Sequence, residues 1–115
     1  MEYVLLIYGN ESAMLNAPKD ATAQTIAAYR AYTEALRKAG VHRASNRLRP
    51  TSDATTVRAS GGKQSVLNGP FAETKEQLAG FYLIDVPDLD AALTWAKRCP
   101  GAAQGSIEVR PVWTA

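Results

Sequence analysis

The segment Asn68-Gly69-Pro70-Phe71 combines residues that form a rigid corner with a polar side chain that can bind other molecules. Gly69 can adopt a backbone conformation closed to other residues, and Pro70 fixes its own φ at about −65°. We expect Phe71 to anchor the corner in the core and Asn68 to close an Asx-turn. Rigidly held loops are also where binding groups tend to lie. The segment therefore predicts either a structural corner alone or a corner that also forms one wall of a binding site.

Charged residues follow this corner directly. Glu73 and Glu76 are three positions apart, which on a helix would place two carboxylates on one face, as acid–base chemistry requires. Thr74 would cap such a helical turn, with Gln77 as its partner three positions later. The alternative is a solvated loop that also includes Lys75, and we favour it because Glu and Lys side chains are usually exposed.

Further polar side chains on the expected strands are candidate contacts for a small planar acid. Arg58 lies in a predicted hairpin, Tyr82 in an apolar strand, and Arg110 alternates with Glu108 in the last strand. We expect these four to project from one sheet face, with Tyr8 beside the cleft between the sheet and the polar loop. An arginine suits a carboxylate because it can bind both oxygens at once. A buried salt-bridge network would explain the same residues without a ligand.

His42 and Cys99 are the only histidine and the only cysteine. His42 follows the end of a predicted helix, so it is either an exposed or capping residue or a general base, and no carboxylate or second histidine accompanies it locally. A single cysteine excludes an internal disulfide and a Cys-based zinc site within one chain. We expect Cys99 and Trp95 to be packing residues, and we expect no metal and no cofactor.

The composition places the chain among ordinary globular domains. Its 115 residues allow one domain, residues 1–115, with one core. Hydrophobic residues make up 46% and charged residues 21%, and the net charge of +2 is too small to indicate direct nucleic-acid or anionic-membrane binding. The sequence has no apolar run of membrane-spanning length and no signal-peptide pattern. We expect a cytoplasmic protein of bacterial type.

The elements that must position the candidate residues follow from apolar periodicity and turn signals. We predict a buried strand, a polar loop, a helix that begins at Asp20 or Thr22, and a strand that ends at Pro50. After these come a hairpin that turns at Gly61-Gly62, a buried strand, a helix capped by Asp88 and a last alternating strand. In chain order the ranges are 2–9 for the first strand, 11–20 for the loop, 20–39 for the helix, 41–50 for the second strand, 54–69 for the hairpin, 80–86 for the buried strand, 88–98 for the second helix and 105–112 for the last strand.

The spacing of apolar residues also predicts which sides of the helices face the core. In the first helix these are Ile26, Tyr29, Thr33 and Leu36, and in the second they are Leu89, Ala92, Leu93 and Ala96.

The order β-α-β-β-α-β indicates an α+β, ferredoxin-like arrangement, with an antiparallel sheet and both helices on one face. The strands at 2–9 and 81–86 are apolar on both faces, whereas half-solvated strands alternate. Two helices cover only one face. We therefore expect the other face to pack against the same face of a second copy, which gives a homodimer.

The chain resembles a known family along nearly its whole length. The segments "EYVLLIYG", "ATTVR", "NGPFAETKEQLAGFYLIDVPDLDAALTWAKRCP" and "IEVRPV" are similar to the DGPF branch of the YCII-related proteins. The family tetrapeptide is Asp-Gly-Pro-Phe, and here Asn68 stands in its first position. The resemblance implies a ferredoxin-like fold that pairs into a dimeric α/β barrel.

The catalytic residues of the family do not carry over. Many YCII-related proteins have a His and an Asp that are regarded as an enzymatic dyad, with the His near the start of the first helix. This chain has no histidine between Thr22 and Ala39, and the segment "KRCPGA" after the second helix lacks the Asp. The amide of Asn68 cannot act as a general base, although it can replace a carboxylate in an Asx-turn.

Two functional hypotheses follow. The first is a lyase or isomerase that acts on a small polar or aromatic acid. The second is a non-catalytic ligand-sensing or accessory module. The resemblance supports the second hypothesis, because proteins of this branch are often encoded beside alternative sigma factors or fused to them. The missing dyad favours the second as well.

Overall fold

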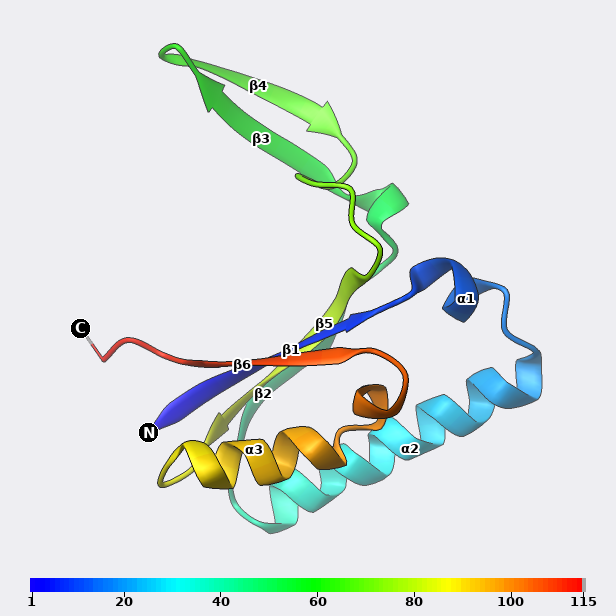
Figure 1. Ribbon diagram of the computed structural model, residues 1–115, viewed down its shortest axis with the longest axis vertical. Helices are drawn as coiled ribbons and strands as arrows, with labels where there is room; N and C mark the ends of the chain where they lie inside the picture. Colours follow the sequence, from blue (N-terminus) through cyan, green and yellow to red (C-terminus); the bar gives the residue numbers. More distant parts are fainter. Residues whose placement is uncertain (115) are drawn as a thin grey trace.

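The computed structural model describes residues 1–114, and four of its strands form one antiparallel sheet. The strands lie in the spatial order β2-β5-β1-β6. Helices α2 and α3 cover one face of this sheet (Figure 1). The bounds are β1 (Glu2–Gly9), α2 (Lys19–Lys38), β2 (His42–Arg47), β5 (Gln77–Asp85), α3 (Leu89–Arg98) and β6 (Ser106–Pro111). The structure thus confirms the α+β class, and its element order is that of the ferredoxin-like arrangement.

The two central strands are apolar on both sides. In β1 the buried residues Tyr3, Leu5 and Ile7 alternate with Val4 and Leu6, which are only half-buried. Because successive side chains of a strand point to opposite faces, the first set lies against the helices and the second on the other face. Strand β5 repeats this pattern with Tyr82 and Ile84 toward the helices and Phe81 and Leu83 away from them. We call this second side of the sheet the open face.

Helix α2 differs from the sequence prediction at its start and in its buried stripe. The residue before its first turn is Pro18, with no side-chain cap, so the predicted cap at Asp20 or Thr22 is wrong. Leu36 is fully buried, whereas Ile26 is 37% exposed. The reason is that the N-terminal half of α2 extends beyond the end of α3 (Figure 1). Tyr32, which the spacing argument missed, is buried.

Helix α3 begins as predicted. The Asp88 carboxylate accepts a hydrogen bond from the backbone N–H of Ala91 at 2.9 Å, which satisfies a free amide of the first turn. Ala92 and Ala96 are buried, but Leu89 at the start of the helix is exposed. A short 3-10 helix, η2 (Pro100–Ala103), follows and leads into β6.

Part of the segment predicted as a polar loop is helical. Residues Glu11–Leu15 form the short helix α1, and Asn10 caps it by accepting a hydrogen bond from the backbone N–H of Ala13 at 3.0 Å. Asn10 was a sequence signal for the start of a helix. The residues after it form no apolar stripe, so the periodicity of the sequence did not indicate a helix there. No helix among residues 1–114 is long and apolar enough to cross a membrane.

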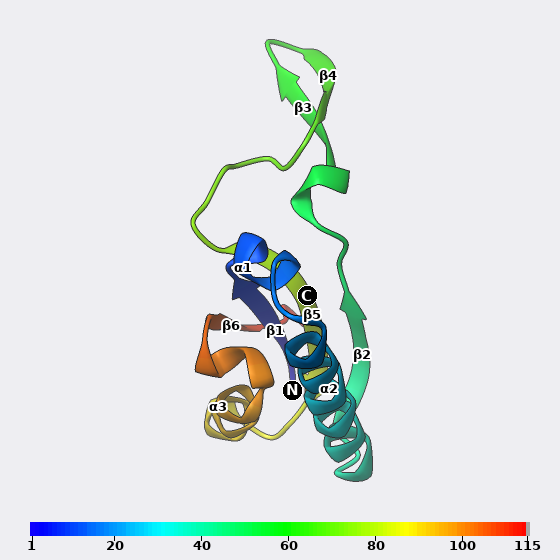
Figure 2. The same cartoon turned by 90° about the vertical axis from the view of Figure 1, so that its right-hand side faces the viewer.

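The predicted hairpin is present and stands away from the sheet. Strands β3 (Thr55–Ser60) and β4 (Lys63–Asn68) pair around Gly61 and Gly62, whose φ values are +58° and +80°. A 3-10 helix, η1 (Thr51–Asp53), precedes the hairpin. We call residues 55–68 the arm, and Figures 1 and 2 show that it projects from the body. The radius of gyration is 15.9 Å, larger than the roughly 13 Å of a compact chain of this length.

The difference between Leu36 and Ile26 can be tested by truncation. We expect Leu36→Ala to lower the free energy of unfolding by about 2–5 kcal/mol, because it leaves a cavity in the core. The same truncation at Ile26 removes a side chain that is already partly exposed, so we expect a loss below about 1 kcal/mol. Urea denaturation measures both, and equal losses at the two positions would contradict the burial described here.

Candidate functional site

A cleft with two adjoining cavities lies where α1, the link from β2 to η1 and the segment 69–77 meet. The inner cavity has a volume of about 70 Å³ and the outer one about 460 Å³. Both are lined by Glu11, Leu15, Pro50 and Gln77, so the two cavities adjoin. Gly69 and Pro70 line the outer cavity. The Gly-Pro corner therefore does form one wall of a cleft.

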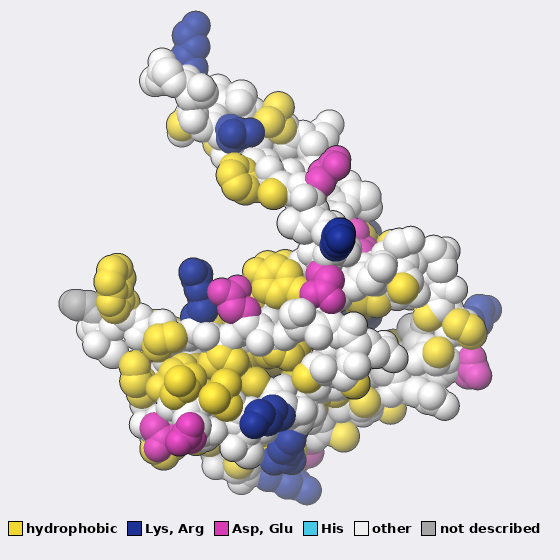
Figure 3. Space-filling view, in the orientation of Figure 1, with side chains coloured by type: hydrophobic (Ala, Val, Ile, Leu, Met, Phe, Trp, Pro, Cys, Tyr) yellow, Lys and Arg dark blue, Asp and Glu magenta, His cyan; other side chains and the backbone are white. Residues whose placement is uncertain are grey.

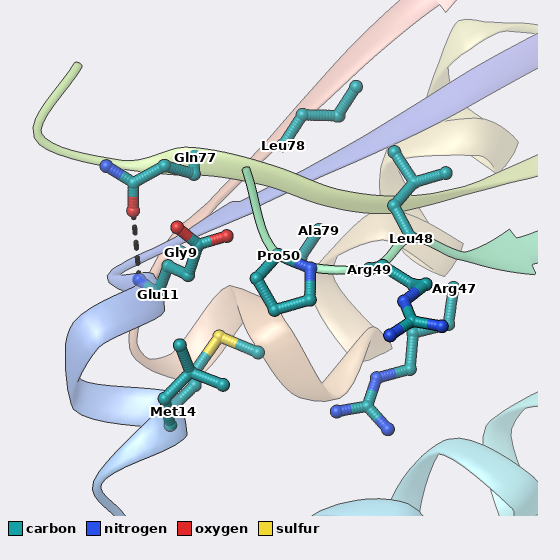
Figure 4. Close-up of a pocket in the computed structure, with 11 residues that line it drawn as sticks. Gly9, Glu11, Met14, Arg47, Leu48, Arg49, Pro50, Gln77, Leu78 and Ala79 are labelled. Atoms are coloured by element: carbon teal, nitrogen blue, oxygen red, sulfur yellow. Dashed lines mark hydrogen bonds between the residues drawn. The ribbon is translucent and has the colours of Figure 1, made fainter. Parts of the chain in front are cut away.

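Glu11 ties the three sides of the cleft together. Its carboxylate accepts hydrogen bonds from the backbone N–H and from the hydroxyl of Thr51, both at 2.6 Å. Its own backbone N–H donates to the side-chain oxygen of Gln77 at 3.0 Å (Figure 4). The Gln77 amide in turn donates to the carbonyl of Thr74 at 2.6 Å. Both carboxylate oxygens of Glu11 thus have a structural role.

Two arginines border the inner cavity. Arg47 and Arg49 are two residues apart on an extended segment, and Figure 4 shows Met14 on the other side of the cavity from them. The Arg49 guanidinium forms an ion pair with Asp53 at 2.9 Å, whereas Arg47 has no ion pair within the part of the chain that the structure describes. Leu48, Pro50 and Met14 supply apolar walls. Arg47 is exposed, and it thus places a positive charge that has no ion pair among the described residues at the edge of a cavity with apolar walls.

Sequence reasoning missed both arginines. The pattern Arg47-Leu48-Arg49-Pro50 was the available signal, because alternation places two cations on one side of a strand that ends at a proline. Only the approach of α1, which is distant from that segment in the sequence, turns the segment into a cavity wall.

The corner at Asn68 is held by hydrogen bonds to the backbone of Gly69. Gly69 has a φ of +104°, its N–H donates to the carbonyl of Ala54 at 2.7 Å, and its carbonyl accepts from the Thr56 hydroxyl at 2.8 Å. Within residues 1–114 the Asn68 side chain makes no hydrogen bond, so the predicted Asx-turn is not formed. The chain closes this corner instead through Ala54, which directly precedes the arm, and Thr56 at its start.

Phe71 does not anchor the corner in the core, as we predicted. Its side chain is 73% exposed, and the Arg58 guanidinium lies 5.4 Å from the centre of its ring. The reason is that the corner lies at the base of the projecting arm, away from the helix-covered face where the core forms. Arg58 is thus engaged by Phe71, and it does not line the cleft.

Tyr82 and Arg110 lie on opposite faces of the sheet, which contradicts the prediction of a shared face. Tyr82 pairs with Leu5 and points toward the helices, where its hydroxyl lies 2.7 Å from that of Thr33. Burial raises the pKa of this hydroxyl, so it stays neutral. Arg110 forms an ion pair with Glu108 at 3.2 Å on the other side of the sheet. Tyr8 is half-buried on the open face.

The carboxylates after the corner do not form an acid–base pair on a helix. The segment 71–76 has no helical turn, because the Thr74 hydroxyl donates to the carbonyl of Glu76 where a capping contact was predicted. The Glu76 carboxylate accepts from the hydroxyl of Ser106 at 2.7 Å, whereas Glu73 lines the outer cavity. The two side chains therefore have separate surroundings.

His42 lies far from the cleft. It is at the first position of β2 and Arg47 at the last, which separates them by about 16 Å at about 3.3 Å per residue. Its Nε2 lies 2.8 Å from the Ser45 hydroxyl. Partial burial, together with the positive charges of Arg37 and Arg43, lowers the pKa of this imidazole below 6.5. The geometry favours a structural role for His42.

Cys99 is buried as predicted, and burial raises the pKa of its thiol, as expected for an unreactive packing residue. The described residues include no group of three or more His, Cys, Asp or Glu side chains that could hold a metal ion.

Comparisons with known proteins agree on the family and the fold. The YCII-related domain family matches residues 1–115. An uncharacterised protein of Rhizobium meliloti (strain 1021) is 43% identical over 118 residues, which cover 97% of this chain and 92% of that protein. In structure, the chain is similar to 5-chloro-2-hydroxyhydroquinone dehydrochlorinase (TftG) from Burkholderia phenoliruptrix AC1100, solved in complex with 2,5-dihydroxybenzoquinone. The TM-score is 0.57 at 14% identity, with 100% of this chain and 96% of that chain covered, so the likeness concerns the fold.

The environment of His42 predicts a pH dependence of stability. Because its pKa in the folded protein is lower than in the unfolded chain, the unfolded chain binds a proton more readily as the pH falls below about 6.5. We therefore expect the wild type to lose stability relative to His42→Gln as the pH falls from about 7.5 to about 5.5. Denaturant titrations of both proteins at several pH values measure this, and a constant difference would contradict it.

Proposed function

We propose that this chain, which belongs to the YCII-related domain family, binds a small organic acid in the cleft between α1, the β2–η1 link and the segment 69–77. The observation that carries the proposal is Arg47, whose guanidinium has no ion pair among the described residues and borders a cavity with apolar walls. A carboxylate ligand would supply the missing negative charge, and the guanidinium can bind both of its oxygens.

The shape and lining of the cleft fit an acid with a compact apolar body. Met14, Leu48 and Pro50 can contact such a body, while Thr51 and Thr74 line the more polar outer cavity. The outer volume of about 460 Å³ lies within the range of about 300–1,000 Å³ that is usual for small-molecule sites. TftG was solved with a dihydroxybenzoquinone, which makes small aromatic acids the first class to test.

Within this site, binding is better supported than acid–base catalysis. Both Glu11 oxygens are engaged by Thr51, and His42 lies at the other end of β2. Tyr82 is on the helix-covered side of the sheet. We therefore prefer the ligand-sensing module to the lyase or isomerase, for which the likeness of the fold to a dehydrochlorinase is the supporting observation.

The cellular setting is a prediction from the resemblance. Membership of the DGPF branch rests on Gly69, Pro70 and Phe71, with Asn68 in the first position of the tetrapeptide. A ligand-sensing role beside an alternative sigma factor in the cytoplasm would follow from that membership.

We also propose that two copies pair through the open face of the sheet. No helix of the described chain covers this face (Figure 1). Its half-buried apolar side chains are those of Val4, Leu6, Phe81 and Leu83. Sheets pack face to face at about 10 Å with interdigitating apolar side chains, so a second copy of this face is a suitable partner.

Ligand binding can be tested with benzoate as the probe. We expect Arg47→Gln to weaken benzoate binding at least tenfold, because it removes a charge-assisted contact of about 1.5–3 kcal/mol. Arg30→Gln, which removes an exposed arginine of α2, is the matched control and should leave affinity unchanged.

Isothermal titration calorimetry measures the affinities, with benzamide as the neutral analogue that should not bind. Equal benzoate affinity in wild type and Arg47→Gln would refute the role of Arg47. Conversion of the probe during the titration would favour the enzyme hypothesis.

The pairing of sheets can be tested with two lysine substitutions. Leu83→Lys places a charge on the open face, and we expect it to shift the protein toward monomer because an unpaired charge would be buried. Leu89→Lys places the same charge on the exposed start of α3 and should not change the association. Analytical ultracentrifugation distinguishes the outcomes, and an unchanged mass for Leu83→Lys would contradict the pairing.

A further inference from the structure

The arm is folded but has almost no support from its own body. All residues of β4 and all but one of β3 are exposed, including Val57 at 61% and Val66 at 68%. An isolated two-stranded hairpin is at best marginally stable in water. Figure 3 shows open space between the arm and the sheet below it. The arm therefore carries an apolar surface that nothing in the described chain covers.

The two sides of the arm differ in charge. Val57 and Val66 lie directly opposite each other, and the pairs Thr55–Asn68 and Ala59–Gln64 share their side. None of these six side chains is charged. The other side carries Arg58 and Lys63. Because charged residues are depleted at the centre of protein interfaces, the uncharged side is suited to a contact and the basic side to solvent.

We propose that the arm clasps a second copy of this chain, with its uncharged side against the partner. This inference rests on the pairing of open faces proposed above. The arm rises on the side of the sheet opposite α2 and α3 (Figures 1 and 2). A copy stacked on the open face therefore enters the space beneath the arm. The two-fold symmetry of such a pair makes the exchange reciprocal, so each copy holds the other.

The area needed for a stable dimer also supports a second copy of this chain as the partner of the arm. Four strands about 4.8 Å apart and about six residues long give an open face of about 400 Å². Stable interfaces bury about 800 Å² per partner, about twice that area. One side of a two-stranded arm adds about 200 Å², and the surface that it covers on the partner adds the same again. Exchange of both arms brings the interface to the usual size.

The experiment compares two glutamate substitutions at neighbouring positions of the full chain. Val66→Glu places a charge on the uncharged side of the arm, and Ser65→Glu places the same charge on the basic side. We expect Val66→Glu to weaken dimerisation at least about tenfold and Ser65→Glu to leave it within about twofold. Sedimentation measures the dimer dissociation constants, and an unchanged far-ultraviolet circular dichroism spectrum shows that the body is folded.

Hydrogen exchange of the arm supplies the second measurement. In the dimer we expect the backbone amides of residues 55–68 to exchange at least about tenfold more slowly than in the monomer obtained by dilution, because docking suppresses opening of the hairpin. A dimer whose arm exchanges as fast as in the monomer would overturn the clasp while leaving the sheet pairing intact. Equal weakening by both glutamates would overturn the assignment of the contact side. A monomer at every concentration would overturn both the clasp and the pairing.

Discussion

The structure depends on a sheet whose two central strands are apolar on both sides. Leu5 and Ile84 are fully buried against the helices, and Leu6 and Leu83 repeat the same chemistry on the other face. Two helices are enough for one side only, because the connections of a βαββαβ order place both of them on the same face. The position of the helices and the exposure of the open face both follow from this constraint.

The same constraint determines where a cleft can form. The core occupies the helix-covered side, so the chain segments at one end of β1 and β5 meet outside it. There, Glu11 connects α1 to Thr51 and Gln77 through three hydrogen bonds. These contacts fix the positions of the three walls relative to one another, and the cavities lie between them. A rigid frame of this kind, with Arg47 at its edge, is suited to recognise a ligand with little reorganisation.

The polar segment after the arm combines two roles. It redirects the chain from the arm into β5, and it closes the outer cavity with Gly69 and Pro70. The left-handed backbone of Gly69 makes both possible, because its N–H bonds to Ala54 and its carbonyl to Thr56 while the chain turns away. The same residues therefore form both the corner of the chain and one wall of the outer cavity.

Local signals in the sequence were sufficient for most of the fold. The unalternating strand at 2–9, the Gly61-Gly62 turn, the Asp88 cap and the alternation of Ile107 with Glu108 each depend on neighbours in the chain, and each is found where it was predicted. The apolar character of both sheet faces was also readable, because it is a property of single strands.

The candidate site depended on contacts between distant segments, which local patterns do not contain. Tyr82 was placed on the wrong face because its direction depends on its pairing with Leu5, and Phe71 was placed in the core although the corner lies outside it. Arg47 became a site residue only because α1 packs near the end of β2. The sequence by itself determined the elements and their apolar sides. The tertiary structure decided which side chains meet, because register and the docking of distant elements set the distances between them.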